Sequence, residues 1–107
     1  MSAASDEVGL EPTRKEVNRM EGSVLLEFGA AWCGHCRMLA PQLAALLGQF
    51  PGVRHIKVED GPGRPLGRSF RVKLWPNLVF LRDGQVLRQL ARPGVHEVRE
   101  GLSLLQP

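Results

Sequence analysis

Both cysteines of this chain of 107 residues lie in one five-residue segment, Trp32-Cys33-Gly34-His35-Cys36. On a helix, the spacing of the cysteines places both sulfur atoms on one side of a single turn, about 4.5 Å apart along the axis. A disulfide can close and open across that separation without a large movement of the backbone. The segment therefore requires a helical turn at the cysteines and predicts two thiols that can be reversibly oxidised.

The residues on both sides of the cysteine pair predict a buried strand that leads directly into a helix. Val24 to Phe28 is almost continuously apolar, as in a strand that is buried on both faces. After the pair, apolar residues recur with helical periodicity as far as Phe50. The cysteines thus fall at the N-terminus of a helix, where the partial positive charge of the helix favours a thiolate.

The length and composition of the chain limit it to one small domain. A chain of 107 residues can bury one core and has no room for a second domain. No apolar run in the sequence approaches the ~20 residues that cross a bilayer, and residues 1–20 lack the apolar segment of a signal peptide. These features predict a cytoplasmic protein without membrane binding. The net charge of +3 comes mostly from arginine and few aromatic residues accompany it, so we expect no nucleic-acid binding.

Metal binding is the main alternative for the cysteine pair, because lone cysteines in the cytoplasm indicate redox or metal chemistry. A closed zinc site needs four ligands, and the three histidines of the chain form no partner motif. A haem attachment site needs a histidine directly after the second cysteine, where Arg37 stands. We therefore expect dithiol chemistry at Cys33 and Cys36, with no metal.

The rest of the chain predicts an alternation of short helices and strands. We expect a frayed end or a weak edge strand over residues 1–10, and a single domain over residues 11–107. The expected elements around the cysteine segment are a short helix from the capping box at Thr13 to Met20, a strand at 53–58, a short helix at 64–70, a hairpin of strands at 77–82 and 85–91, and a helix at 95–105. A strand, a crossover helix and a second strand are usually parallel. The order thus predicts an α/β fold with a mixed central sheet, mostly parallel with a C-terminal antiparallel hairpin, and helices on both faces.

The segment from Glu27 to Cys36 strongly resembles the active site of the thioredoxin superfamily. Its Gly-His insert is similar to that of protein disulfide isomerase domains, whereas ordinary thioredoxins have Gly-Pro. The resemblance covers about residues 23–105 and implies the thioredoxin fold. Beyond the active-site segment it rests on Ala40-Pro41, Phe70-Arg71-Val72, Trp75-Pro76 and residues 78–84.

The resemblance implies a role for each residue near the thiols. Cys33, which we expect to be partly exposed, would attack a client disulfide, and Cys36, one turn deeper, would resolve the mixed disulfide. Glu27 interrupts an apolar strand, and in this family a carboxylate at its position accepts the proton of the resolving cysteine. Lys57 matches the basic partner of that carboxylate.

The resemblance also implies a client-binding groove beside the cysteines. Pro76 would follow a cis peptide bond and pack against the disulfide, with the backbone before it pairing with the client. Trp75 stands where a smaller residue is common, and it fits a core position and a place in the groove equally well. Arg92 stands where the family usually has a glycine that lines the groove. Three residues of the motif itself would contact clients or tune the redox potential: Trp32, Gly34 and His35.

Several other residues depart from the family pattern or carry no expected role. Gly29 replaces a common aromatic residue, and Asn77 replaces a frequent threonine. We expect His55 and His96 to be surface residues. Three arginines are expected to share one solvated helix face: Arg64, Arg68 and Arg71.

These features predict a small thiol–disulfide oxidoreductase that reduces disulfides of client proteins and binds no cofactor. In this family the electrons usually come from NADPH through a flavoprotein, which implies a donor similar to thioredoxin reductase. We expect the protein to be a monomer. Two alternatives stay open: an oxidase or isomerase that runs the reaction in the other direction, and an adaptor that binds one partner without turnover.

Replacing His35 by proline tests the residue that separates this motif from the Gly-Pro of ordinary thioredoxins. An imidazole that donates to Cys33 would stabilise its thiolate, which exists only in the reduced protein. A contact of roughly 1.5–3 kcal/mol would raise the reduction potential by roughly 30–60 mV. We therefore expect His35→Pro to be the stronger reductant in equilibrium with glutathione. An equal or higher potential would show that His35 only fills the turn.

Overall fold

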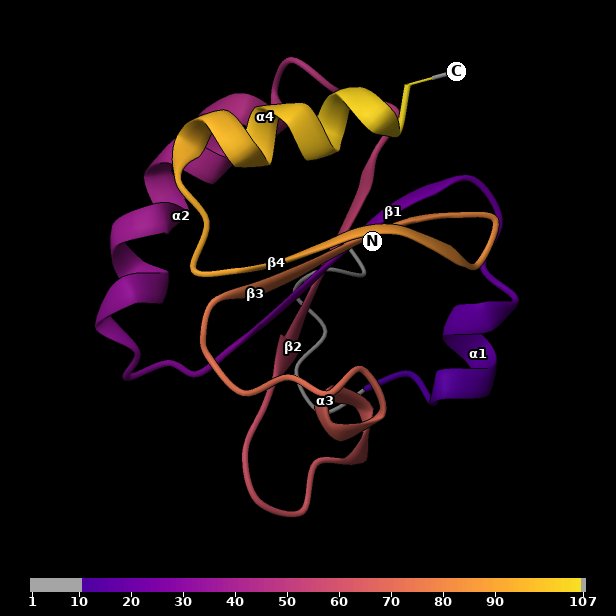
Figure 1. The fold of residues 1–107 in the computed structure, drawn as a ribbon, viewed down its shortest axis with the longest axis vertical. Helices are drawn as coiled ribbons and strands as arrows, with labels where there is room; N and C mark the ends of the chain where they lie inside the picture. Colours follow the sequence, from indigo (N-terminus) through magenta and orange to yellow (C-terminus); the bar gives the residue numbers. More distant parts are fainter. Residues whose placement is uncertain (1–10, 107) are drawn as a thin grey trace.

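A four-stranded sheet runs through the middle of the computed structural model, which describes residues 11–106 (Figure 1). The spatial order of the strands is β2-β1-β3-β4. Helices α2 and α4 cover one face of the sheet, and α1 and α3 cover the other. The bounds along the chain are α1 (Arg14–Asn18), β1 (Ser23–Gly29), α2 (Gly34–Leu47), β2 (Arg54–Glu59), α3 (Pro65–Ser69), β3 (Asn77–Arg82), β4 (Gln85–Ala91) and α4 (Val95–Leu104). This arrangement confirms the predicted α/β fold with helices on both faces.

The predicted domain bounds stay a prediction. The expected frayed end or weak edge strand at residues 1–10 lies outside the described part of the chain. At its start, α1 has the predicted capping box: the hydroxyl of Thr13 accepts the backbone N–H of Glu16, and the Glu16 carboxylate accepts the N–H of Thr13. In residues 11–106, no helix is both long and apolar enough to cross a membrane.

The strand pairing corrects the prediction of a mostly parallel sheet. β1 is parallel to β2 but antiparallel to β3, and β3 is antiparallel to β4, so two of the three pairs in the described sheet are antiparallel. The connection from β2 to β3 contains one short helix, α3, of five residues. In the strand register, the last residues of β2 and the first residues of β3 both lie beside the end of β1. β3 thus starts near the end where β2 stops and runs in the opposite direction.

β1 is central because its sequence supplies apolar side chains to both faces of the sheet. Its five inner residues are all buried, which confirms the predicted strand. Leu26 and Phe28 belong to the cluster on the side of α1 and α3, whereas Leu25 belongs to the cluster under α2 and α4. Glu27 is the one charged residue among them. Its burial is therefore the feature of β1 that the packing of apolar side chains does not explain.

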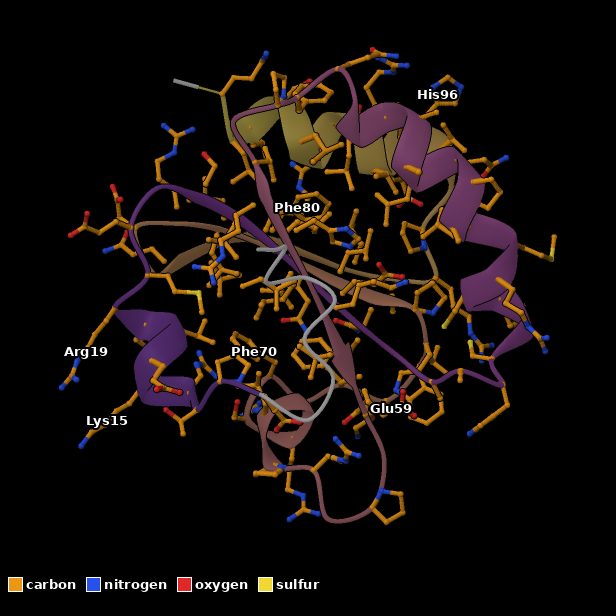
Figure 2. All side chains as sticks on the ribbon, turned by 180° about the vertical axis from the view of Figure 1, so that it is seen from behind. Lys15, Arg19, Glu59, Phe70, Phe80 and His96 are labelled. Carbon is orange, nitrogen blue, oxygen red and sulfur yellow. The ribbon has the colours of Figure 1, made fainter. Side chains whose placement is uncertain are left out.

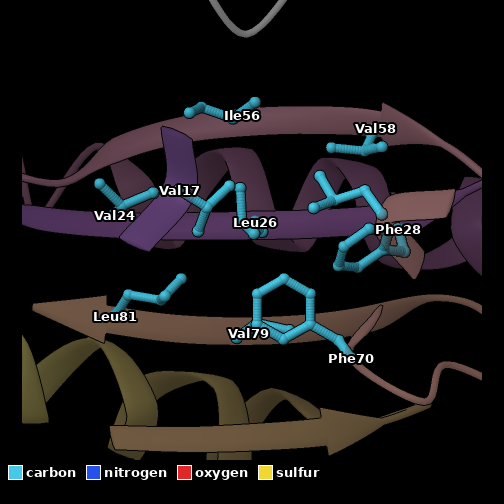
Figure 3. Packing of buried hydrophobic residues seen from close by; sticks show 10 residues of the cluster. Val17, Val24, Leu26, Phe28, Ile56, Val58, Phe70, Val79 and Leu81 are labelled. Atoms are coloured by element: carbon cyan, nitrogen blue, oxygen red, sulfur yellow. The ribbon is translucent and has the colours of Figure 1, made fainter. Parts of the chain in front are cut away.

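Two apolar clusters hold the helices to the sheet. Figure 3 shows the cluster on the side of α1 and α3, and Figure 2 shows Phe70 and Phe80 on opposite sides of the sheet. The first cluster consists of Val17, Val24, Leu26, Phe28, Ile56, Val58, Leu66, Phe70, Val79 and Leu81. The second consists of Leu25, Leu39, Leu43, Leu46, Phe50, Leu78, Phe80, Val98, Leu102 and Leu105.

A substitution at Gly101 tests how tightly α4 packs on the sheet. A Cβ atom at this position would lie 2.5 Å from Cζ of the fully buried Phe80 ring. We expect Gly101→Ala to lower the free energy of unfolding by about 1–2 kcal/mol in urea titrations, because overpacking outweighs the gain in helix propensity. Gly52→Ala is the control, since a Cβ there meets no atom within 4 Å. Equal losses in the two variants would contradict the close contact of α4 and Phe80.

Candidate active site

The two cysteines lie at the junction of β1 and α2, as the sequence predicts. Cys33 is the N-cap of α2, and its Sγ accepts a hydrogen bond from the backbone N–H of Cys36 at 3.2 Å. The backbone N–H of Cys33 donates to the carbonyl oxygen of Ala30. Sulfur thus takes the place of the usual oxygen acceptor at the positive end of the helix, where a negative charge is stabilised. Both cysteines are free thiols.

The exposure of the two thiols is the reverse of the prediction. Cys33 is only 6% exposed, whereas Cys36, which we expected to lie deeper, is half-buried. The hydrogen bond to the N–H of Cys36 folds the Cys33 side chain back over the first turn of α2. The Sγ of Cys36 lies against Gly29, where a Cβ atom would be only 2.7 Å away. Gly29 thus provides space for this sulfur and has no side chain with which to cover it.

Cys36 keeps its proton at neutral pH. Burial raises the pKa of the Cys36 thiol from its ordinary value of 9.0 to about 11, helped by the hydrogen bond with Cys33 and by the negative charges of Cys33 and Glu27. A backbone hydrogen bond with Ala30 lowers this pKa but does not offset the other effects. At pH 7 only about one Cys36 thiol in ten thousand is ionised. Cys36 therefore needs a base before it can attack another sulfur.

Glu27 is buried as expected, but its partner is a different residue from the one the family pattern implies. The Oε1 atom of Glu27 lies 2.7 Å from Nε2 of His55 on β2. Lys57 is directly opposite Glu27 in the strand register, yet its side chain is exposed, and within residues 11–106 no ion pair or hydrogen bond joins the two. β2 is an edge strand of the described sheet, so a long lysine can hydrate its ammonium group there. His55, expected at the surface, is instead partly buried against Glu27.

Trp75 belongs to the core and to the surface beside the thiols. Its ring packs on the cluster that contains Phe70, and its Nε1–H donates to Oδ2 of Asp60 at 2.9 Å. The same ring meets Trp32, which is 70% exposed, edge to face with the ring centroids 5.2 Å apart. The core position of Trp75 is thus confirmed, and its place in a client groove stays a prediction. Asp60 was not among the predicted site residues, because its place in a Gly- and Pro-rich segment indicated only a loop.

The segment before β3 and the end of β4 meet through Arg92. The Trp75–Pro76 peptide bond is cis, as predicted, and Pro76 is buried. The backbone N–H of Arg92 donates to the carbonyl oxygen of Pro76 at 2.8 Å, and its Nε–H donates to that of Trp75 at 2.7 Å. Arg92 has a φ of 47°, in the left-handed region that favours glycine. Gly34 and His35 are exposed on the first turn of α2.

The three arginines near α3 do not share one helix face. Only Arg68 lies within α3, because the helix begins at Pro65, after Arg64, and ends before Arg71. A cavity of about 520 Å³ beside Asp60 collects four basic side chains: Arg64, Arg68, Arg71 and Lys73. Within residues 11–106, no three His, Cys, Asp or Glu side chains come together in a way that could hold a metal ion.

Two free thiols at the start of a helix, one of them its N-cap, next to a buried carboxylate, fit the chemistry of a thiol–disulfide oxidoreductase. Comparison with known proteins gives the same result: the chain belongs to the thioredoxin family, whose model, described as "Thioredoxin", matches residues 9–100. The protein is a thiol–disulfide oxidoreductase with Cys33 and Cys36 as its cysteine pair.

Relatives and solved structures agree with this assignment. Thioredoxin Asp f 28 of Aspergillus fumigatus is 34% identical over 80 residues, which is 74% of each chain. Protein disulfide-isomerase A2 of Pongo abelii is 43% identical over 70 residues, which is 62% of this chain but 13% of that protein. The structure of thioredoxin 2 from Pseudomonas aeruginosa in its reduced form has 51% sequence identity and a TM-score of 0.79, with 89% of each chain covered.

Adding a methyl group at Gly29 tests the space that holds Cys36. In the reduced protein the methyl would displace the Cys36 Sγ from its place against Gly29, whereas in a disulfide that sulfur is bonded to Cys33. We expect Gly29→Ala to lower the reduction potential by roughly 20 mV, equivalent to about 1 kcal/mol, because it destabilises the reduced form. Equilibration with glutathione measures the shift, with Gly52→Ala as the control. A potential equal to or above that of the unmodified protein would contradict this role of Gly29.

Proposed function

We propose that the protein reduces disulfides of client proteins, with Cys33 as the attacking thiol and Cys36 as the resolving thiol. The observation that carries the assignment is the raised pKa of the Cys36 thiol, next to a Cys33 sulfur that accepts a hydrogen bond. The Sγ of Cys33 accepts a hydrogen bond at the N-terminus of α2, whereas the pKa of Cys36 is about 11. Cys36 is the more exposed residue, but a thiol that is almost wholly protonated is a poor nucleophile. The high pKa of Cys36 therefore outweighs its greater exposure, and Cys33 is assigned the attack.

The reaction has two exchanges of sulfur–sulfur bonds. The Cys33 thiolate attacks one sulfur of the client disulfide, the client bond breaks, and the other client sulfur leaves as a thiolate. Cys36 then transfers its proton to Glu27 and attacks the Sγ of Cys33. The bond between Cys33 and the client breaks, and the second client sulfur leaves with its electron pair. The client has gained two electrons, and Cys33 and Cys36 have become a disulfide.

The groove for the client lies along Trp32, Trp75, Pro76 and Arg92. The exposed Trp32 ring and the edge of Trp75 offer apolar contact beside Cys33. The Nε–H of Arg92 donates a hydrogen bond to the carbonyl oxygen of Trp75. A client backbone that pairs with this carbonyl therefore replaces the guanidinium as the donor. Gly34 leaves the first turn of α2 open, and His35 lies exposed next to it.

Electrons for the next cycle would come from NADPH through a flavoprotein similar to thioredoxin reductase. This donor, a monomeric state and a place in the cytoplasm belong to the proposal, which is supported by the similarity to H-type thioredoxins such as that of Ricinus communis, 28% identical over 86 residues. Consumption of NADPH by the disulfide form in the presence of thioredoxin reductase tests the donor.

The Gly-His insert and the similarity to protein disulfide-isomerase A2 favour the second candidate, an oxidase or isomerase. The equilibrium with glutathione separates the two directions. A potential near about −270 mV, as in thioredoxin, supports reduction, and one near about −180 mV, as in protein disulfide isomerase, supports the second candidate.

Replacing each cysteine by serine tests the division of labour. Cys33→Ser should lose disulfide reductase activity by about a thousandfold or more, because no attacking thiolate remains. Cys36→Ser should instead hold clients as stable mixed disulfides, which intact-mass measurements detect. Alkylation of the unmodified protein at neutral pH provides the control, with Cys33 reacting faster. If Cys36 reacts faster, the assignment of the two roles is wrong.

A further inference from the structure

Glu27 contacts a histidine in place of the lysine that the family pattern provides. The Oε1–Nε2 distance is 2.7 Å, and the side chains of Glu27 and His55 are 7% and 22% exposed. An ionised carboxylate with so little contact with water is costly unless donors replace the lost hydration. Within residues 11–106, the imidazole of His55 is the one side chain that hydrogen-bonds this carboxylate.

The position of His55 follows from the parallel pairing of β1 and β2. In the register Leu25 is opposite His55, and Glu27 is opposite Lys57, so all four side chains lie on the face covered by α2. The imidazole is stiff and short, and it crosses from its own position to the carboxylate of the neighbouring strand. The lysine at the next position on this face of β2 is solvent-exposed. The sheet thus brings Glu27 to a partner that sequence comparison alone does not select.

Few charged groups face this pair. β3 contributes Leu78 opposite Glu27, which is apolar and fully buried. Of the other ionisable residues of α2, His35 is exposed, and Nη2 of Arg37 donates to the carbonyl oxygen of Trp32. The titratable groups that remain are Cys33 and Cys36 at the start of α2, and the exposed Lys57 and Glu59 on the same face of β2. The negative charge of Glu27 contributes to the high pKa of Cys36, which shows that the carboxylate and this thiol are electrostatically coupled.

We propose that His55 is the positioning residue for Glu27: its N–H donates to the buried carboxylate and holds it directed for proton transfer from Cys36. This inference rests on the proposed function and adds the residue on which the resolving step depends. The proton moves from the Cys36 sulfur to the Glu27 carboxylate, and Cys36 forms its bond to Cys33 as the bond to the client breaks. Without the donor, no side chain in residues 11–106 fixes the carboxylate in place, so it is less often directed to accept the proton from Cys36.

The test follows the reduced protein after rapid mixing with excess oxidised glutathione. A first phase, whose rate rises with glutathione concentration, reports attack by Cys33. A second phase, independent of that concentration, reports closure of the Cys33–Cys36 disulfide, and the fluorescence of Trp32 and Trp75 follows it. Both phases are measured across the pH range in which the protein stays folded.

His55→Leu removes the donor, and His55→Gln keeps an N–H the same number of bonds from the backbone. We expect the leucine variant to close its disulfide about tenfold more slowly at pH 7. The glutamine variant should stay within about threefold of the unmodified protein. The first phase should be unchanged in both. His96→Gln, on the exposed surface of α4 (Figure 2), is the matched control and should leave both phases unchanged.

A double variant shows whether His55 acts through Glu27. In a Glu27→Gln background, His55→Leu should cause no further slowing, because the group that His55 positions is no longer a base. His55→Asn, whose amide is one carbon shorter and falls short of the carboxylate, replaces the leucine variant if that protein does not fold.

Two results would overturn the role of His55. They are an unchanged second phase in the leucine or asparagine variant, and slowing of the glutamine variant equal to that of the leucine variant. Failure of the unmodified protein to show the first phase would instead refute the proposed function itself.

Discussion

The hydrogen bond from the N–H of Cys36 to the Sγ of Cys33 is the contact on which the site depends. It caps α2 with a sulfur atom, and it sets the sulfur at the positive end of the helix. The same contact folds Cys33 back over the first turn, so that the thiol proposed to attack is the less exposed one. The atom that caps α2 is thus also the atom to which the proposal assigns the attack on the client disulfide.

The two thiols differ because their surroundings differ. The Sγ of Cys33 accepts a hydrogen bond at the positive end of α2. Partial burial, the hydrogen bond with Cys33 and nearby negative charge raise the pKa of the Cys36 thiol to about 11, although Cys36 is the more exposed of the two residues. In the proposed mechanism a protonated Cys36 needs a base, the buried Glu27 is that base, and the contact with His55 offsets the cost of burying its carboxylate. In this proposal the protonated Cys36 thiol requires a buried carboxylate, and the buried carboxylate requires a hydrogen-bond donor.

The client side of the site is built by segments that are far apart in the sequence. Asp60, at the end of β2, accepts the indole N–H of Trp75, and Trp75 meets Trp32 before α2. Arg92, at the end of β4, holds the carbonyl oxygen of Trp75. These segments meet because β2 ends where β3 begins, and β4 returns to the same edge. The antiparallel direction of β3 thus brings the residues of the proposed client groove together.

The sequence by itself determined the elements and the chemistry of the site. The apolar run of β1, the periodicity of α2 and the spacing of Cys33 and Cys36 are local signals, because strands, helices and disulfides depend on residues close together in the chain. The tertiary structure alone decided the direction of β3, the partner of Glu27 and the order of exposure of the two thiols. The resemblance to the family favoured Lys57 as the partner of Glu27, because the charge of a residue can be read from a sequence. Whether a side chain on one strand reaches the side chain of a paired strand cannot be read in this way. The space at Gly29 likewise exists only where β1 and α2 meet, so its effect on Cys36 depends on contacts between residues that the linear pattern does not relate.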